Sequence, residues 1–147
     1  MFKKILVPTD GSPLSEKSIY AAVEFARANG SEIIAVSVAE PYVYSMFAEG
    51  SGVIPVESKA HDERVQELAQ KHVEKVAKLA QARNVACKTR VSLSFSPYEE
   101  IVQAAKEFHC DVIFMASHGR KGLNKLFVGS ETQKVLAHST IPVLVFR

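Results

Sequence analysis

The 147-residue sequence predicts an α/β fold, namely a single-domain open parallel β-sheet with helices on both faces. Short runs rich in Ile, Leu and Val alternate along the chain with longer segments of helical periodicity, and parallel strands require such crossover helices. Hydrophobic residues make up 47% of the chain, which is enough for a full core without disulfide bonds or a structural metal. The alternation follows the order β-α-β-α-β-α-β-α-β.

The first strand is expected at 3–9 and the second at 32–39, because both are continuous apolar runs typical of strands buried on both faces. Between them, Ser12 is suited to an N-cap and Pro13 to the first position of a helix. This helix ends where Gly30 can adopt a left-handed conformation. Its buried stripe consists of Ile19, Ala22, Val23 and Ala26.

Residues 40–57 show no clean period and contain glycines and prolines, so we expect a long loop there. Helical spacing returns after this loop and lasts up to Asn84. The apolar stripe of the second helix consists of Val65, Leu68, Ala69, His72, Val73, Val76, Leu79 and Ala80. Its one histidine is interpreted as a core or interface residue.

The third strand is expected at 86–94 and the fourth at 111–116. The helix between them should open with a capping box, in which Ser96 and Glu99 bond each other's backbone amides, with Pro97 at the first helical position. Its buried stripe consists of Ile101, Val102, Ala105 and Phe108.

A glycine-rich loop comes next, and Ser130 with Gln133 makes a second capping box. This box starts a short helix that runs to about His138, and 141–146 is the last strand. Both faces of that strand are apolar, so it would be prone to pairing if it lay at a sheet edge. Either a second copy of the chain or the helices alone would cover it.

Composition excludes several classes of protein. The formal net charge of +2 is small for a protein that binds nucleic acid through phosphate contacts. Cys87 and Cys110 are interpreted as buried thiols, because two cysteines argue against a disulfide scaffold. No run approaches the ~20 apolar residues of a membrane span, and the first ten residues lack the features of a secretory signal. We therefore expect a cytoplasmic protein without membrane insertion.

Two strand ends carry the residues best suited to bind a ligand. In open parallel sheets, ligands bind beyond the carboxyl ends of the strands. Here the first strand runs into TDG (9–11) and the fourth into ASHG (116–119). The two other internal strand ends, at 39 and 94, show less obvious chemistry.

The loop after the fourth strand predicts an anion site. Glycines let several backbone N–H groups converge on one point, and the helix that begins at Ser130 adds the positive end of its dipole. A phosphate is the natural ligand. Alternatively, the glycines only shape a turn and ease helix–strand packing, and the loop's basic residues are as easily solvated charges as ligands. The loop's glycines and basic residues are Gly119, Arg120, Lys121, Gly122, Lys125 and Gly129.

Other site chemistries find little support in the sequence. The motifs GxxxxGK[ST], GxGxxG and GxSxG are absent, which argues against a P-loop, a dinucleotide fingerprint and a hydrolase elbow. The five histidines show no i, i+4 pair on one helix face, so no dedicated zinc site is expected. His118 differs from the others because it lies in the glycine loop, where it could contact a phosphate or orient the loop.

Over essentially its whole length the sequence resembles the universal stress protein family. The resemblance is carried by KKILVPTDGS, SPYEEIV, DVIFMASHGRKGLNKLFVGS and IPVLVF. The family's nucleotide signature, Gly-x2-Gly-x9-Gly-Ser/Thr, falls on Ala116, Gly119, Gly129 and Ser130, so three of its four positions match. The alanine adds one methyl group that a phosphate would have to accommodate. The chain resembles the ATP-binding branch.

The resemblance implies a Rossmann-like sheet of order 3-2-1-4-5, in which the strand order reverses between strands one and four. It also implies roles for single residues. Pro8, Thr9 and Asp10 would hold the ribose and adenine, and Val38 would contact adenine through its backbone. Met115 and Ala116 would border the ribose and phosphates; Gly119, Gly129 and Ser130 would hold the phosphates, with Mg or Mn as a companion metal. The other candidates near them are Ser117, His118, Arg120, Gly122 and Glu131.

The leading hypothesis is an ATP-binding regulatory protein of the stress-response type, with ADP or AMP as alternative ligands and little or no turnover. Asp10 near a phosphate and metal would support slow ATP cleavage at most, because no arginine finger or defined base is present, and no catalytic residue is assigned. Family resemblance also implies a homodimer joined through 141–146. Two rivals remain: a slow ATPase, and a nucleotide-free interaction module that presents Tyr42, Tyr44 and Phe47 to an unknown protein partner. The loop that carries these three residues could equally serve as a nucleotide lid.

Overall fold

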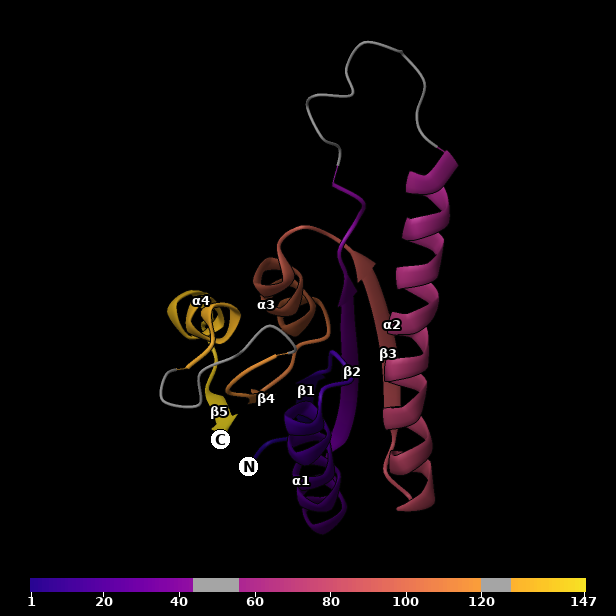
Figure 1. Ribbon diagram of the computed structural model, residues 1–147. Helices are drawn as coiled ribbons and strands as arrows, with labels where there is room; N and C mark the ends of the chain where they lie inside the picture. The colour runs from indigo at the N-terminus through magenta and orange to yellow at the C-terminus, as the bar shows by residue number, and fades with distance from the viewer. Residues whose placement is uncertain (44–55, 120–127) are drawn as a thin grey trace.

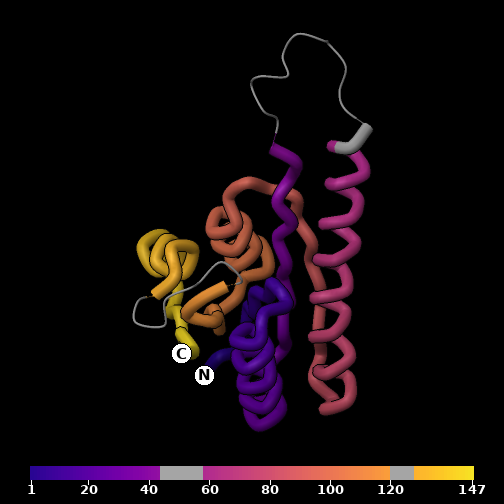
Figure 2. The backbone as a smooth tube through the Cα atoms, in the orientation of Figure 1, coloured from indigo at the N-terminus to yellow at the C-terminus, as the bar shows by residue number. Residues whose placement is uncertain are grey.

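The computed structural model describes residues 1–43, 56–119 and 128–147. Neighbouring strands pair in parallel, and the five-stranded sheet has the order β3-β2-β1-β4-β5. The predicted fold class and strand order are therefore confirmed. Figure 1 shows the arrangement and Figure 2 traces each crossover from strand to helix to strand. The elements are β1 (Lys4–Pro8), α1 (Pro13–Asn29), β2 (Glu32–Ala39), α2 (Val56–Ala82), β3 (Cys87–Leu93), α3 (Pro97–Glu107), β4 (Val112–Ala116), α4 (Ser130–His138) and β5 (Val143–Phe146).

Two helices cover each face of the sheet. On one face α1 and α2 pack over a core that includes Ile5 and Phe114. On the other face α3 and α4 pack over a core that includes Leu6 and Ile113. Successive residues of a strand point to opposite faces, so neighbouring residues of β1 and β4 belong to different cores. Apart from Lys4 at the start of β1, these strands consist of apolar residues, as is typical of strands buried on both sides.

Helix α1 forms as the sequence predicts. The Ser12 hydroxyl accepts a hydrogen bond from the Ser15 amide at 3.2 Å, and Pro13 is the first helical residue. Gly30 ends the helix with φ 67°, and its N–H donates to the Ala26 carbonyl. All four residues of the predicted apolar stripe are buried.

Helix α2 differs from its prediction at its beginning. The predicted loop at 40–57 extends two residues too far, because α2 begins at Val56. Its first turns extend beyond the end of the sheet in Figure 1, so they have no need of an apolar stripe. The Tyr42 amide donates to Asp62 Oδ1 at 2.7 Å, and the Tyr42 and His61 rings lie 5.6 Å apart, which ties the segment after β2 to this helix.

Parts of the predicted stripes are also wrong. Leu68 on α2 is 41% exposed, although the helical spacing places it with buried neighbours. On α3, Ala104 is buried while Val102 is only partly buried, and Phe108, the C-cap residue, is partly buried against the core. The last strand begins at Val143, after the predicted start at residue 141.

Neither predicted capping box forms. Ser96 is the N-cap of α3 but makes no side-chain cap bond, and the Tyr98 amide donates instead to Glu131 Oε2 at 3.0 Å. The N-cap of α4 is Gly129 and not Ser130, and it likewise makes no side-chain cap bond. Gln133, the distal member of the second predicted box, donates through Nε2 to the Val128 carbonyl at 2.6 Å. At α3 a partner from another segment therefore replaces the local one, and at α4 the partner of Gln133 is a backbone carbonyl just before the helix.

The two cysteines are free thiols in the part of the chain that the structure describes. Cys110 is buried and Cys87 is partly buried. Burial raises the pKa of each thiol to about 11.

These raised pKa values predict poor thiol reactivity in the native protein. At pH 8 only about one thiol in a thousand would be ionised, and the thiolate is the reactive form. We expect iodoacetamide to label Cys87 and Cys110 at least ~100-fold more slowly in the native protein than in urea, as measured by mass spectrometry. Equal labelling rates in both states would contradict the burial of these side chains.

Candidate functional site

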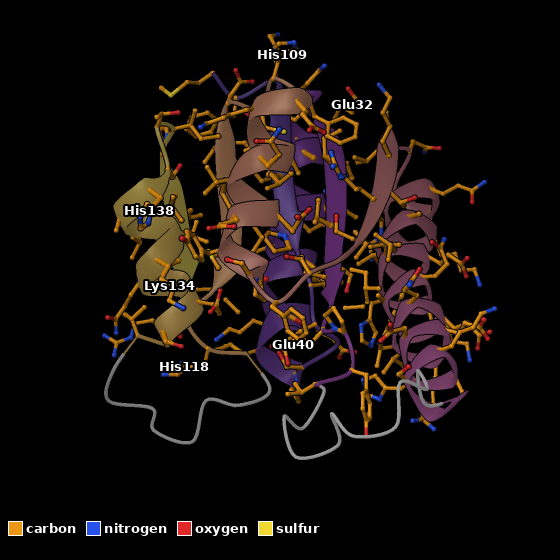
Figure 3. The ribbon with its side chains drawn as sticks, turned by 90° about the horizontal axis from the view of Figure 1, so that it is seen from above. Glu32, Glu40, His109, His118, Lys134 and His138 are labelled. Carbon is orange, nitrogen blue, oxygen red and sulfur yellow. The ribbon has the colours of Figure 1, made fainter. Side chains whose placement is uncertain are left out.

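The carboxyl ends of β1 and β4 lie beside each other, as the strand order requires. The contact between them is close: a β-carbon on Gly119 would lie 2.6 Å from Asp10 Oδ2. Asp10, which follows β1, and Gly119, which follows β4, therefore lie next to each other. Figure 3 shows His118 and Glu40 at this end of the sheet, with Glu32 and His109 at the opposite end.

The turn after β1 is built by polar groups that are mostly buried. The Ser12 amide donates to Asp10 Oδ1 at 2.9 Å, and Oδ2 is the carboxylate oxygen that a β-carbon on Gly119 would approach. The buried Thr9 receives the Gly11 amide on Oγ1 at 3.2 Å, and its carbonyl accepts the Ser37 hydroxyl at 2.8 Å. The backbone amide of Ser12 thus holds one oxygen of the Asp10 carboxylate.

A residue that sequence reasoning placed elsewhere also reaches this turn. His72 of α2 lies so close to Gly11 that a β-carbon there would overlap the imidazole ring. Gly11 has φ 74°, so glycine is required at this position both by its left-handed backbone and by the approach of the ring. The sequence signal for this contact was the histidine on an otherwise apolar stripe.

A hydrogen bond joins the residues on either side of the glycine loop. The Gly129 amide donates to the Ser117 carbonyl at 2.7 Å, and a β-carbon on Gly129 would lie 3.1 Å from that same oxygen. This close approach explains the glycine. It also means that the Gly129 N–H, expected to hold phosphate, serves to close the loop in this structure.

The amino end of α4 faces the same region. The Thr132 hydroxyl donates to the Ala116 carbonyl at 3.0 Å, which docks the first turn of α4 onto the end of β4. Ser130 is the first helical residue, and the glycine N-cap before it supplies no side-chain acceptor. The first turn of α4 carries N–H groups and the positive end of the helix dipole, which favour an anion.

His118 has an unsatisfied nitrogen. Its Nδ1 lies 2.8 Å from the Ser117 hydroxyl oxygen. Its Nε2 is buried and has no hydrogen-bond partner in the described part of the chain. A buried ring nitrogen without a partner costs about 1–3 kcal/mol, so an absent ligand group is a natural explanation.

Three of the residues expected around the nucleoside share one face of the sheet. Met115 and Val38 both pack with the core beneath α3 and α4, and Pro8 follows Leu6 of that core by two positions. The Met115 side chain is itself buried among core residues, so only its edge or its backbone could border a ligand. Ala116 is buried as well, and its methyl group is accommodated within the sheet.

Glu131 lies at the site through its backbone only. Its carboxylate turns toward α3, where Oε2 accepts the Tyr98 amide at 3.0 Å. Its Oε1 pairs with Lys134 at 3.1 Å, and the Lys134 ammonium lies 5.5 Å from the centre of the Tyr98 ring. The Glu131 side chain thus joins α4 to the first turn of α3.

This arrangement predicts a stability role for Glu131. Glu131→Ala should lower the free energy of unfolding by about 1–2 kcal/mol, because the Tyr98 amide at the start of α3 loses its acceptor. Glu131→Gln should lose less, since it keeps an acceptor oxygen. Urea unfolding measures both, with Glu67→Ala on the exposed side of α2 as control. Equal unfolding midpoints for Glu131→Ala and Glu67→Ala would contradict the capping role.

Some expected features lie outside the described residues or elsewhere in the molecule. Arg120 and Gly122, together with Lys121, Lys125, Tyr44 and Phe47, belong to the undescribed segments 44–55 and 120–127. Across the described ranges, His, Cys, Asp and Glu side chains form no group of three that could hold a metal ion. No helix in those ranges has both the length and the apolar character of a membrane span.

A cavity of about 360 Å³ lies away from these strand ends, between α3 and the connection from α4 to β5. Val102, His109, Cys110 and Ile141 are among its lining residues. None of the residues expected to bind a nucleotide lines it. Because the buried unsatisfied nitrogen and the glycine contacts all lie at the carboxyl end of the sheet, that end is the stronger candidate for a binding site.

An open parallel sheet with its polar residues gathered where the strand order reverses defines a Rossmann-like α/β protein. The profile of the universal stress protein family matches residues 1–147. The chain therefore belongs to the universal stress protein family. It is 32% identical to universal stress protein MJ0531 of Methanocaldococcus jannaschii over 100% of this chain and 83% of that protein. It is also 32% identical to universal stress protein YxiE of Bacillus subtilis, over 100% of both chains.

Solved structures agree with this assignment. The structure of MJ0577 from Methanocaldococcus jannaschii superposes with a TM-score of 0.82 at 30% identity, covering 99% of this chain and 96% of that one. A universal stress protein in complex with cAMP has a TM-score of 0.70 at 18% identity, covering 99% and 97%. The Archaeoglobus fulgidus protein in complex with dAMP has a TM-score of 0.66 at 18% identity, covering 99% and 98%. The last two likenesses concern the fold alone.

Proposed function

We propose that this protein is an ATP-binding universal stress protein, a single-domain cytoplasmic regulator that responds to nucleotide with little or no turnover. The observation that carries the proposal is the meeting of Asp10 with Gly119 beside the amino end of α4. An acid suited to ribose hydroxyls and a cluster of amide donors suited to phosphates then lie on either side of one ligand position.

Adenine nucleotide is the ligand class that these groups fit. Several charge-assisted hydrogen bonds at ~1.5–3 kcal/mol each would support micromolar binding, near −8 kcal/mol. The apolar residues Val38 and Met115 on the α3–α4 face would border the base and ribose. Proteins of the same fold have been solved with cAMP and with dAMP, which supports an adenine nucleotide without distinguishing ATP from ADP or AMP.

The residues present fit a divalent cation that arrives with the nucleotide. Mg²⁺ commonly takes one or two carboxylates and completes its shell with phosphate oxygens and water. Asp10 Oδ2 is the carboxylate oxygen beside the loop, while Oδ1 is already engaged by the Ser12 amide. Bound Mg²⁺ or Mn²⁺ would neutralise phosphate charge next to this acid, and the Asp10 carboxylate would help to hold it.

The test of the proposal is nucleotide release and thermal stabilisation. Heat-denatured protein should release an adenine nucleotide that chromatography identifies. Added ATP at 100 times its Kd should contribute about 2.7 kcal/mol, which raises Tm by roughly 5–10 °C for a chain of this size. If no nucleotide is released and ATP, ADP and AMP leave Tm unchanged, the protein is better described as an interaction module. Single-turnover hydrolysis with Mg²⁺ or Mn²⁺ separates a binder from a slow ATPase.

We propose further that the protein is a homodimer joined through residues 141–146. Strand β5 lies at the edge of the sheet, where its backbone groups can pair with a second copy. Leu144 on this strand is 46% exposed and Leu136 on α4 is 47% exposed. Covering these side chains would bury apolar surface that the described helices leave open.

A charged substitution on β5 tests the proposed dimer. Leu144→Glu should convert the dimer to a monomer in analytical ultracentrifugation, because it places a carboxylate within an apolar contact. Leu68→Glu on α2 is the matched control, since Leu68 is 41% exposed and lies away from β5. A wild-type protein that sediments as a monomer at micromolar concentration would refute the proposed assembly.

A further inference from the structure

Ser117 and His118 form a pair whose geometry is fixed by the backbone. The Ser117 N–H donates to the Phe146 carbonyl at 2.7 Å, and its carbonyl accepts the Gly129 amide at 2.7 Å. Ser117 is completely buried, so its hydroxyl cannot turn to water. The hydroxyl oxygen lies 2.8 Å from His118 Nδ1, which is its partner within the described residues.

The two tautomers of a neutral His118 ring differ in how many buried polar groups have a hydrogen-bond partner. If Nδ1 carried the proton, it would donate to the Ser117 oxygen, and both the hydroxyl proton and Nε2 would lack a partner. If Nε2 carries the proton, the hydroxyl donates to Nδ1 and only the Nε2–H lacks a partner. Each unsatisfied buried group costs about 1–3 kcal/mol, so the second arrangement is favoured.

We infer that the Ser117 hydroxyl holds His118 as the Nε2–H tautomer, and that this N–H donates to a phosphate oxygen of the bound nucleotide. Ser117 is then a positioning residue and His118 a donor of the site. The inference rests on the proposed nucleotide site and adds a defined role for this pair. Figure 3 shows His118 at the rim beside the start of α4.

The surroundings of His118 Nε2 favour a phosphate as its hydrogen-bond partner. The Cα of His118 would lie 3.4 Å from a β-carbon on Gly129, so the ring begins at the base of the glycine loop. The first turn of α4 presents amide donors there and the positive end of its dipole. A phosphate has acceptor oxygens only, so an N–H donor matches it where a bare ring nitrogen would repel it.

The tautomer is measured first, in nucleotide-free protein. In ¹⁵N-histidine-labelled protein at about pH 8, above the range in which free histidine titrates, His118 should show a protonated Nε2 and an unprotonated Nδ1. His118→Gln assigns the signals. Addition of ATP, or of inorganic tripolyphosphate, should shift the Nε2–H proton downfield. A protonated Nδ1 in the free protein would overturn the inference.

The role of Ser117 is measured by affinity. Ser117→Ala should weaken ATP binding about tenfold, which corresponds to ~1.4 kcal/mol, because the ring loses the hydrogen bond that orients it and selects its tautomer. Ser18→Ala is the matched control, since Ser18 is also completely buried and its hydroxyl bonds the Ser15 carbonyl within α1; its Kd should stay at the wild-type value. In a His118→Gln background, where the amide donor needs no tautomer, Ser117→Ala should have no further effect.

The outcomes separate the two proposals. If ATP raises Tm but leaves the His118 signals unchanged, the inference is wrong and the nucleotide site stands. If Ser117→Ala weakens binding equally in both backgrounds, Ser117 is merely structural and the inference is also wrong. If ATP does not bind but tripolyphosphate shifts the Nε2–H signal, the nucleotide proposal fails and the anion-donor role stands. If neither ligand binds, both fail.

Discussion

Gly119→Val should weaken ATP binding about a hundredfold, because its β-carbon would take the position of the Asp10 carboxylate. At 2.6 Å from Oδ2 the new side chain forces the carboxylate away, and the loss of one or two charge-assisted bonds accounts for a change of this size. Isothermal titration with ATP and Mg²⁺ measures the effect. The fold should persist, since the displaced group is the end of a side chain.

The matched control is another glycine changed to the same residue. Gly30→Val meets no atom within 4 Å but must adopt φ 67°, so it should lower stability and leave the Kd for ATP unchanged. Gly129→Val should impair both properties, because its β-carbon meets the Ser117 backbone, which cannot swing aside. ATP affinity that is the same in Gly119→Val as in the wild type would exclude Gly119 from the binding site.

Phe114→Ala should have the largest effect on folding, about 3–5 kcal/mol of unfolding free energy. Phe114 is 3% exposed, and its ring lies 5.4 Å from that of Phe25 and 5.9 Å from that of Phe146. Its removal empties the centre of an aromatic row that connects α1, β4 and β5. For a protein with an ordinary stability of about 5–15 kcal/mol, this is a large fraction of the total.

Urea unfolding followed by circular dichroism tests the expectation. Phe95→Ala is the control of equal chemistry, because Phe95 is 64% exposed and should change stability by no more than about 0.5 kcal/mol. Similar midpoints for the two variants would show that the core on the α1–α2 face is organised differently from the structure described above.

The fold could be predicted from the sequence because its signals are local and repeated. The strand at 32–39 and the caps Ser12 and Gly30 depend on residues within a few positions of each other, and all three predictions are confirmed. The strand order followed from family resemblance and not from periodicity. It is this order that brings Asp10 to Gly119, so the location of the candidate site was foreseen with it.

One kind of error arises where a distant partner replaces a local one. The capping box at Ser96 is a sound local pattern, yet the carboxylate that caps α3 comes from Glu131. The contact between His72 and Gly11 joins α2 to the turn after β1, and no spacing rule reports it. The lack of a hydrogen-bond partner at His118 Nε2 depends on how the side chains pack. The sequence shows only that a histidine lies in a glycine loop.

The contact between Glu131 and the Tyr98 amide has a consequence for local unfolding. Helix α1 is capped by its own Ser12, so its N-cap bond is local. The first turn of α3 cannot open without releasing the side chain that α4 contributes. Amide hydrogen exchange should therefore report a shared opening event for the starts of α3 and α4, and whatever steadies α4 from outside would slow exchange in α3 as well.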